Sequence, residues 1–125
     1  MEKLKRFREN LAKEQIDAMI ITNPYNRRYI SNFTGTSGIV IISEKEAKFI
    51  TDFRYTEQAA KQAVGFEIVK HTGPIENEVA AQVKAMGVKK IGFEQDDLTF
   101  ATYKIYEGLV EGELVPISGF VEKLR

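Results

Sequence analysis

The sequence IVIISEKEAKFIT occupies residues 39–51 and contains two short apolar runs, Ile39–Ser43 and Ala47–Thr51. Three polar residues, Glu44–Glu46, separate the two runs. A polar connection of this length between runs rich in β-branched residues predicts a β-hairpin, whose strands are antiparallel. Strands that are joined through helices run parallel instead, so a single hairpin among them predicts a mixed sheet.

Outward from the hairpin, the apolar pattern predicts helices that alternate with strands. Leu4, Phe7 and Leu11 share one face of a helix, and Gly65 and Gly87 stand where two further helices should end. The predicted helices cover residues 2–15, 56–64 and 74–86, with a short helical turn at 26–29 and a helix that begins at 120. A further helix is capped by either Asp97 or Thr99 and runs to about residue 110. The remaining predicted strands cover residues 18–22, 66–69, 90–93 and 114–117. This order predicts an α/β fold, a three-layer domain with a mixed sheet of about six strands flanked by helices.

The composition is that of a folded, soluble protein. The chain has 125 residues, of which 43% are hydrophobic and 29% charged, so one domain over residues 1–125 can bury a core without metal or disulfides. Eighteen Lys and Arg balance eighteen Asp and Glu, which predicts neither a nucleic-acid nor a membrane partner. The absence of cysteine excludes thiolate chemistry and fits a cytoplasmic location.

The residues offer no convincing catalytic set. Ser37 lies between glycines, but the second glycine of a nucleophile elbow is missing, and a turn before a strand is the favoured interpretation. The single histidine, His71, is interpreted as a loop residue and cannot form a His-rich metal site alone. Glu94, Asp96 and Asp97 are of the type that binds hard cations, but the start of the next helix is the favoured interpretation. We therefore predict no catalytic residue and no metal ligand in this chain.

Two segments concentrate aromatic rings and arginines. One covers residues 23–35 and opens with an Asn-Pro pair that is expected to end the preceding strand, and the other is Asp52–Tyr55. Loops of this composition are typical of recognition surfaces, because rings and guanidinium groups combine contact area with hydrogen bonding. In the alternative, Tyr29 and Phe33 plug the end of the core while the arginines are solvated. The residues alone leave both possibilities open.

These segments resemble a known family, the amino-terminal domain of creatinase, prolidase and Xaa-Pro aminopeptidase. The stretches that carry the resemblance are, in chain order, Ile16-Asp17-Ala18, Asn23-Pro24-x-Asn26-x-x-Tyr29-Ile30-Ser31-Asn32-Phe33-Thr34-Gly35, Thr51-Asp52-x-Arg54-Tyr55-x-x-Gln58-Ala59, Ile91-Gly92-Phe93-Glu94 and Leu98-Thr99. The closing residues 121–125 are similar to the family's segment that leads into a second domain. The resemblance covers essentially the whole chain and is strongest to bacterial Xaa-Pro dipeptidases and aminopeptidases.

The resemblance implies a two-domain parent enzyme whose catalytic carboxy-terminal domain is absent from this chain. In that family the catalytic domain binds a pair of divalent metal ions, manganese or cobalt, which activate a hydroxide to cleave the bond before proline. The present domain is then expected to contact its own catalytic domain and to pack against other subunits of a homo-oligomer, expected to be a dimer. It would restrict the substrates to short proline-containing peptides.

On this resemblance, Tyr29, Phe33, Arg54 and Tyr55 are expected to act in substrate gating or in the subunit interface. Arg54 can either pair with an acid of its own loop, such as Asp52, or bind a peptide carboxylate through two parallel hydrogen bonds. The last helical pattern stops at the end of the chain, as a boundary within a longer protein would leave it. The alternative function is a free-standing α/β binding module for a small ligand or peptide. We expect the chain alone to have no peptidase activity.

Overall fold

The predicted hairpin forms two inner strands of a sheet in the computed structural model, which describes residues 2–125. Strand β2 (Ile39–Ser43) pairs antiparallel with β3 (Ala47–Thr51), and both strands have the predicted bounds. Ser43 closes the turn between them. Its N–H donates to the Glu46 carbonyl at 2.8 Å, and its Oγ accepts the Glu46 N–H at 3.1 Å.

The sheet has six strands in the order β4-β3-β2-β1-β5-β6. The other four strands are β1 (Ala18–Ile21), β4 (Glu67–Lys70), β5 (Lys90–Glu94) and β6 (Glu113–Ile117). β1 is antiparallel to β2 and parallel to β5, β5 is parallel to β6, and β3 is parallel to β4. Every strand except β2 therefore runs in the same direction, and the predicted mixed α/β sheet is confirmed.

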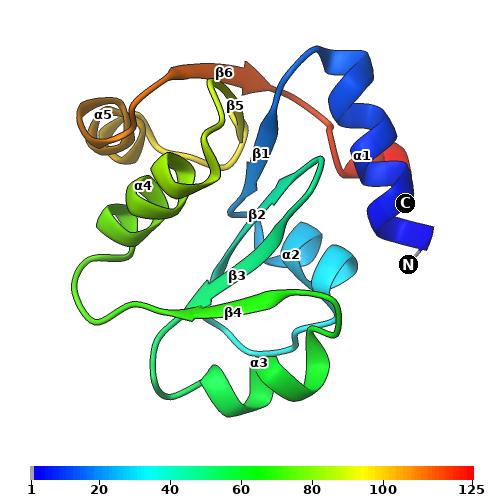
Figure 1. Ribbon diagram of the computed structural model, residues 1–125, viewed down its shortest axis with the longest axis vertical. Coiled ribbons are helices and arrows are strands. Elements are labelled where there is room, and N and C mark those ends of the chain that lie inside the picture. Colours follow the sequence, from blue (N-terminus) through cyan, green and yellow to red (C-terminus); the bar gives the residue numbers. More distant parts are fainter. Residues whose placement is uncertain (1) are drawn as a thin grey trace.

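Helices pack on both faces of the sheet (Figure 1). They are α1 (Glu2–Glu14), α2 (Pro24–Ser31), α3 (Thr56–Gln62), α4 (Ile75–Met86), α5 (Phe100–Leu109) and a 3₁₀ helix, η1 (Glu122–Leu124). Alternate residues of each strand point to opposite faces, and two hydrophobic cores result. One core joins α4 and α5 to strand residues such as Ile41 and Ile50. The other joins α1, α2 and α3 to strand residues such as Val40 and Phe49.

The short helical turn predicted at 26–29 was wrong in its length, because α2 is a complete helix over eight residues. The Asn-Pro pair ends β1 and also starts this helix. The Asn23 side-chain oxygen accepts the N–H groups of Tyr25 and Asn26 at 2.9 and 3.1 Å, and Pro24 occupies the first helical position, where its missing N–H costs nothing. Asn32, in the left-handed conformation with φ 67°, ends the helix.

The helix predicted to begin at residue 120 was also wrong. Phe120 and Val121 are buried residues before η1, and only Glu122–Leu124 form one 3₁₀ turn. The ring of Phe120 packs 4.7 Å from that of Phe7 on α1, centroid to centroid. This contact holds the segment against the sheet's α1 face.

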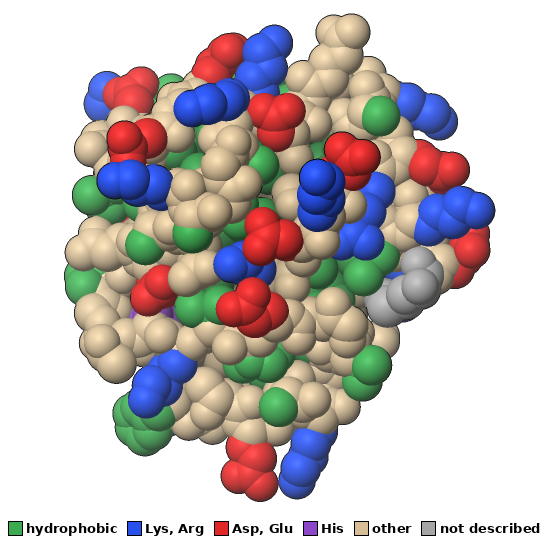
Figure 2. All heavy atoms as spheres, viewed as in Figure 1, with side chains coloured by type: hydrophobic (Ala, Val, Ile, Leu, Met, Phe, Trp, Pro, Cys, Tyr) green, Lys and Arg blue, Asp and Glu red, His purple; other side chains and the backbone are tan. Residues whose placement is uncertain are grey.

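Charges of both signs are interspersed on the surface seen in Figure 2, in agreement with the balanced composition. Among residues 2–125, no helix is long and apolar enough to cross a membrane.

Candidate functional site

The two segments selected from the sequence lie at one edge of the sheet. β1 and β3 run in the same direction, so their carboxyl ends lie at the same edge of the sheet. β2 is antiparallel to both strands, so it begins at this edge. The Tyr55 hydroxyl lies 2.7 Å from Thr36 Oγ1, and the Tyr55 ring meets the Phe33 ring edge-on at 5.8 Å. We call the edge of the sheet at which β1 and β3 end the carboxyl edge.

Most polar groups of the first segment are used inside the domain. Arg27 is only 4% exposed, and its guanidinium donates to the carbonyls of Gly38 at 2.9 Å and Gly35 at 3.0 Å. Burial lowers the pKa of Arg27. The alternative in which the arginines of this segment are solvated is therefore wrong for Arg27, although Arg28 is exposed. Arg27 fixes the turn that leads into β2.

Phe33 and Tyr29 occupy different surroundings. Phe33 is completely buried and packs on Phe49 at 4.6 Å between ring centroids. Tyr29 is half-buried, and its hydroxyl donates to the Leu124 carbonyl at 2.9 Å and accepts from Arg6. Both side chains make contacts inside the domain, and the expectation that they act in gating or at an interface stays a prediction.

The second segment is exposed. Arg54 makes two parallel bonds to Asp52, from Nε to Oδ1 at 2.8 Å and from Nη2 to Oδ2 at 2.9 Å. These bonds from Arg54 lower the pKa of Asp52 to about 2. Arg54 was expected either to pair with an acid of its own loop or to bind a peptide carboxylate. In the structure it pairs with Asp52 of its own loop. The guanidinium carbon also lies 5.2 Å from the Tyr55 ring centroid, and Arg54 remains largely exposed.

Phe53 and Tyr25 are the aromatic residues of these segments that the sequence analysis missed. Their side chains are 76% and 77% exposed, respectively. No pattern in the sequence distinguishes these two rings from the buried ones, because exposure depends on contacts with residues far away in the chain.

Glu94, at the end of β5, ties this strand to the start of α2. It is 7% exposed, and its carboxylate accepts the N–H groups of Thr22 and Asn23 and the side-chain amide of Asn26, at 2.7 to 2.8 Å. Burial raises the pKa of Glu94, against the effect of these three donors. The role of Glu94 in this structure is to hold two parts of the carboxyl edge together.

The other two acids of the same cluster do not start the next helix. Thr99 caps α5, with its Oγ1 accepting the Thr102 N–H at 3.1 Å. Asp97 accepts the Thr22 hydroxyl, and Asp96 accepts the Ser118 hydroxyl. The interpretation of Asp96 and Asp97 as a helix start was therefore wrong, and the alternative cap, Thr99, is confirmed. Within residues 2–125, no group of three or more His, Asp or Glu side chains is placed to hold a metal ion.

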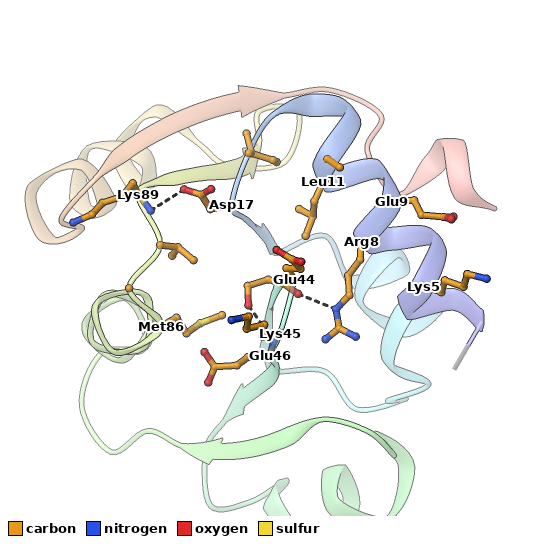
Figure 3. A pocket seen from close by; sticks show the side chains of 15 residues that line it. Lys5, Arg8, Glu9, Leu11, Asp17, Glu44, Lys45, Glu46, Met86 and Lys89 are labelled. Carbon is orange, nitrogen blue, oxygen red and sulfur yellow. Dashed lines mark hydrogen bonds between the residues drawn. The ribbon is translucent and has the colours of Figure 1, made fainter.

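A cleft of about 980 Å³ lies at the opposite edge of the sheet, between α1, the hairpin turn and the end of α4 (Figure 3). Two charged residues of this cleft, Arg8 and Asp17, bind backbone groups and so stabilise the fold. Arg8 Nε donates to the Ser43 carbonyl at 2.9 Å, and Asp17 accepts the N–H groups of Lys89 and Lys90. The rest of the lining mixes lysines with glutamates, so no class of charged ligand is favoured. None of the residues predicted for gating lines this cleft.

Fold and site together define a three-layer α/β domain that presents an aromatic and guanidinium surface at the carboxyl edge of its sheet. The family model of the creatinase/prolidase N-terminal domain matches residues 3–125, and the chain belongs to this family. The resemblance seen in the sequence is therefore confirmed.

Relatives and solved structures agree with this assignment. The chain is 46% identical over 124 residues to the uncharacterized peptidase YqhT of Bacillus subtilis (strain 168), covering 98% of this chain and 35% of that protein. It matches the Xaa-Pro dipeptidase from Bacillus anthracis with a TM-score of 0.98 and 55% identity, over 100% of this chain and 35% of that one. The chain thus spans about a third of the length of these two proteins.

A third match has the same extent as this chain. The N-terminal domain of the cytoplasmic peptidase PepQ from Mycobacterium tuberculosis H37Rv matches with a TM-score of 0.91 and 32% identity, over 99% of this chain and 98% of that one. A domain of this size has therefore been crystallised by itself in the family.

Proposed function

We propose that this chain is the non-catalytic N-terminal domain of an Xaa-Pro dipeptidase or aminopeptidase, and that it contributes to subunit assembly and to gating of a partner's active site. The observation that carries the proposal is the exposed group formed by Phe53 and Arg54 at the carboxyl edge. Aromatic and arginine side chains are enriched where proteins contact their partners, and an exposed pair at the end of a strand is well placed for such a contact.

The chemistry of the proposed parent belongs to its second domain. That domain would bind two divalent metal ions, manganese or cobalt, and short proline-containing peptides. The residues of the present chain would narrow the entrance to the cleft of a neighbouring subunit in a cytoplasmic homo-oligomer, most simply a dimer. Arg54 has a guanidinium nitrogen, Nη1, that makes no bond to Asp52 and could reach a peptide carboxylate.

The test is an Arg54→Ala variant of the two-domain parent. Loss of a charge-assisted contact to the substrate should lower kcat/KM for Xaa-Pro peptides roughly ten- to a hundredfold, or weaken subunit association. Lys104→Ala is the matched control, because it removes a cation from an exposed ion pair with Glu107 on α5. If both variants have the kinetics and oligomeric state of the parent, Arg54 has no gating role. Peptide binding by the 125-residue chain alone would favour the free-standing binding module instead.

A further inference from the structure

The last residues of the described chain are built into the domain. Phe120 and Val121 are buried in the same hydrophobic core as Phe7. The side-chain amide of Asn10 on α1 donates to the Phe120 carbonyl at 3.3 Å, in a buried position. Residues 119–124 are therefore anchored to the α1 face of the sheet. Figure 1 shows the carboxyl end of the chain next to α1.

A cluster of hydrogen bonds follows this anchor. The Leu124 carbonyl accepts the Tyr29 hydroxyl from α2 at 2.9 Å and Arg6 Nη1 from α1 at 3.1 Å. Arg6 Nη2 also donates to the Tyr29 hydroxyl at 3.0 Å, which joins the two donors to each other. The Tyr29 ring is held in turn by Lys3, whose Nζ lies 4.5 Å from the ring centroid and donates to the Tyr29 carbonyl at 2.9 Å.

This arrangement fixes the orientation of one peptide group. A carbonyl with two donors from two different helices can rotate only by giving up both bonds, and each is worth roughly a fivefold shift in a local opening equilibrium. The carbonyl belongs to Leu124, whose N–H is also bound, to the Val121 carbonyl at 2.8 Å. The direction of the chain at residue 124 is therefore determined by α1 and α2 together.

We propose that Arg6, Tyr29 and the Leu124 carbonyl form an exit latch that sets the orientation of this domain relative to the catalytic domain of its parent. The inference rests on the proposed function, since it needs a second domain after residue 125. In this proposal Tyr29 is a positioning residue. It fixes the direction in which the chain continues toward the catalytic domain and makes no contact with the substrate peptide. A surface that gates a cleft must be held at a set distance from it, because a misplacement of about 1 Å can cost on the order of a hundredfold in rate.

The first experiment uses the 125-residue chain. Tyr29→Phe removes the hydroxyl and keeps the ring, and Tyr25→Phe is the matched control, because Tyr25 lies on the same helix with its side chain 77% exposed. Hydrogen exchange of the amides of residues 123–125 should be about fivefold faster in Tyr29→Phe and unchanged in Tyr25→Phe, while the midpoint of global unfolding stays within the error of the parent. Arg6→Leu should act in the same direction. Exchange in Tyr29→Phe at the parental rate overturns the latch.

The second experiment measures the orientation itself in the two-domain parent. The chain has no cysteine, so a single Cys at exposed Gln95 can carry a spin label, with a second label in the catalytic domain. The distribution of distances between the labels should be wider in Tyr29→Phe than in the parent or in Tyr25→Phe. An unchanged distribution overturns the proposal even if the exit segment exchanges faster. A parent without Xaa-Pro peptidase activity would overturn the proposed function, while the distances would still decide on the latch.

Discussion

Residues 23–35 and residues 52–55 lie at the same edge of the sheet and have similar compositions, yet the domain uses them in opposite ways. The first segment is mostly used inside the domain, although Tyr25 and Arg28 are exposed. Its Arg27 and Phe33 are buried, and its polar groups cap α2 or hold the turn before β2. The second segment leaves Phe53 and Arg54 exposed. A loop that combines rings and arginines is thus available to a partner only where the fold leaves those side chains exposed.

The largest expected difference between the two segments is in the free energy of unfolding when one ring of each segment is replaced by alanine. Phe33→Ala should lower the free energy of unfolding by about 3–5 kcal/mol, because it leaves a cavity beside Phe49. Phe53→Ala should change it by less than about 0.5 kcal/mol, since that side chain is 76% exposed. Urea unfolding of both variants provides the measurement. Similar losses in the two variants would remove the distinction between the segments.

The two neighbouring arginines of α2 give a second comparison within the first segment. Arg27→Met should lower the free energy of unfolding by about 1–3 kcal/mol, because the buried carbonyl of Gly38 and the partly buried carbonyl of Gly35 lose their donor. Arg28→Met serves as the control at an exposed position of the same helix and should be nearly neutral. The measurement is again urea unfolding. A neutral Arg27→Met variant would mean that water or a backbone shift satisfies the carbonyls of Gly35 and Gly38.

A smaller, pH-dependent effect is expected at Glu94. Burial raises its pKa in the folded state, so folding favours the protonated carboxyl, and this contribution is lost as the pH rises through the folded pKa. Glu94→Gln cannot titrate. The parent should therefore lose stability relative to Glu94→Gln as the pH rises from 4 to 7, as urea unfolding across that range would show. A constant difference would indicate that the three donors to Glu94 balance its burial, and a parent that gains stability relative to Glu94→Gln as the pH rises would indicate that they outweigh it.

The smallest effect is local to the second segment. The pKa of Asp52 is lowered to about 2 by Arg54, so the stability that this pair supplies is present at neutral pH and is lost as the pH falls from about 4 toward 2. In Arg54→Ala the pKa of Asp52 should return toward its ordinary value of 3.8, as measured by NMR titration of the side-chain carboxyl. An Asp52 pKa that stays near 2 in this variant would show that Arg54 is not paired with it in solution.

The sequence was sufficient for those parts of the fold that depend on neighbouring residues. The hairpin bounds, the mixed sheet and the family all follow from apolar runs, turn residues and motif spacing, and the structure and comparisons confirm them. The full length of α2 was also a local feature, since the Asn cap and the Pro at the first helical position could have predicted it.

The use of individual polar side chains could not be predicted, because it depends on partners far away in the chain. Glu94 binds the start of α2, some 70 residues earlier, and the Tyr29 hydroxyl binds Leu124. No periodicity encodes such contacts. For the same reason, the expectation that Tyr29, Phe33, Arg54 and Tyr55 act in gating or at an interface stays a prediction.

The contact between Phe7 and Phe120 has a consequence for the synthesis of the protein. A ribosome adds roughly 5–20 residues per second, so the first helix emerges about 6 to 23 s before the ring that completes its packing is made. During that time the apolar side of the nascent helix, with Leu4, Phe7 and Leu11, lacks one of its native neighbours. We expect the domain to complete its packing only when its last residues have left the ribosome.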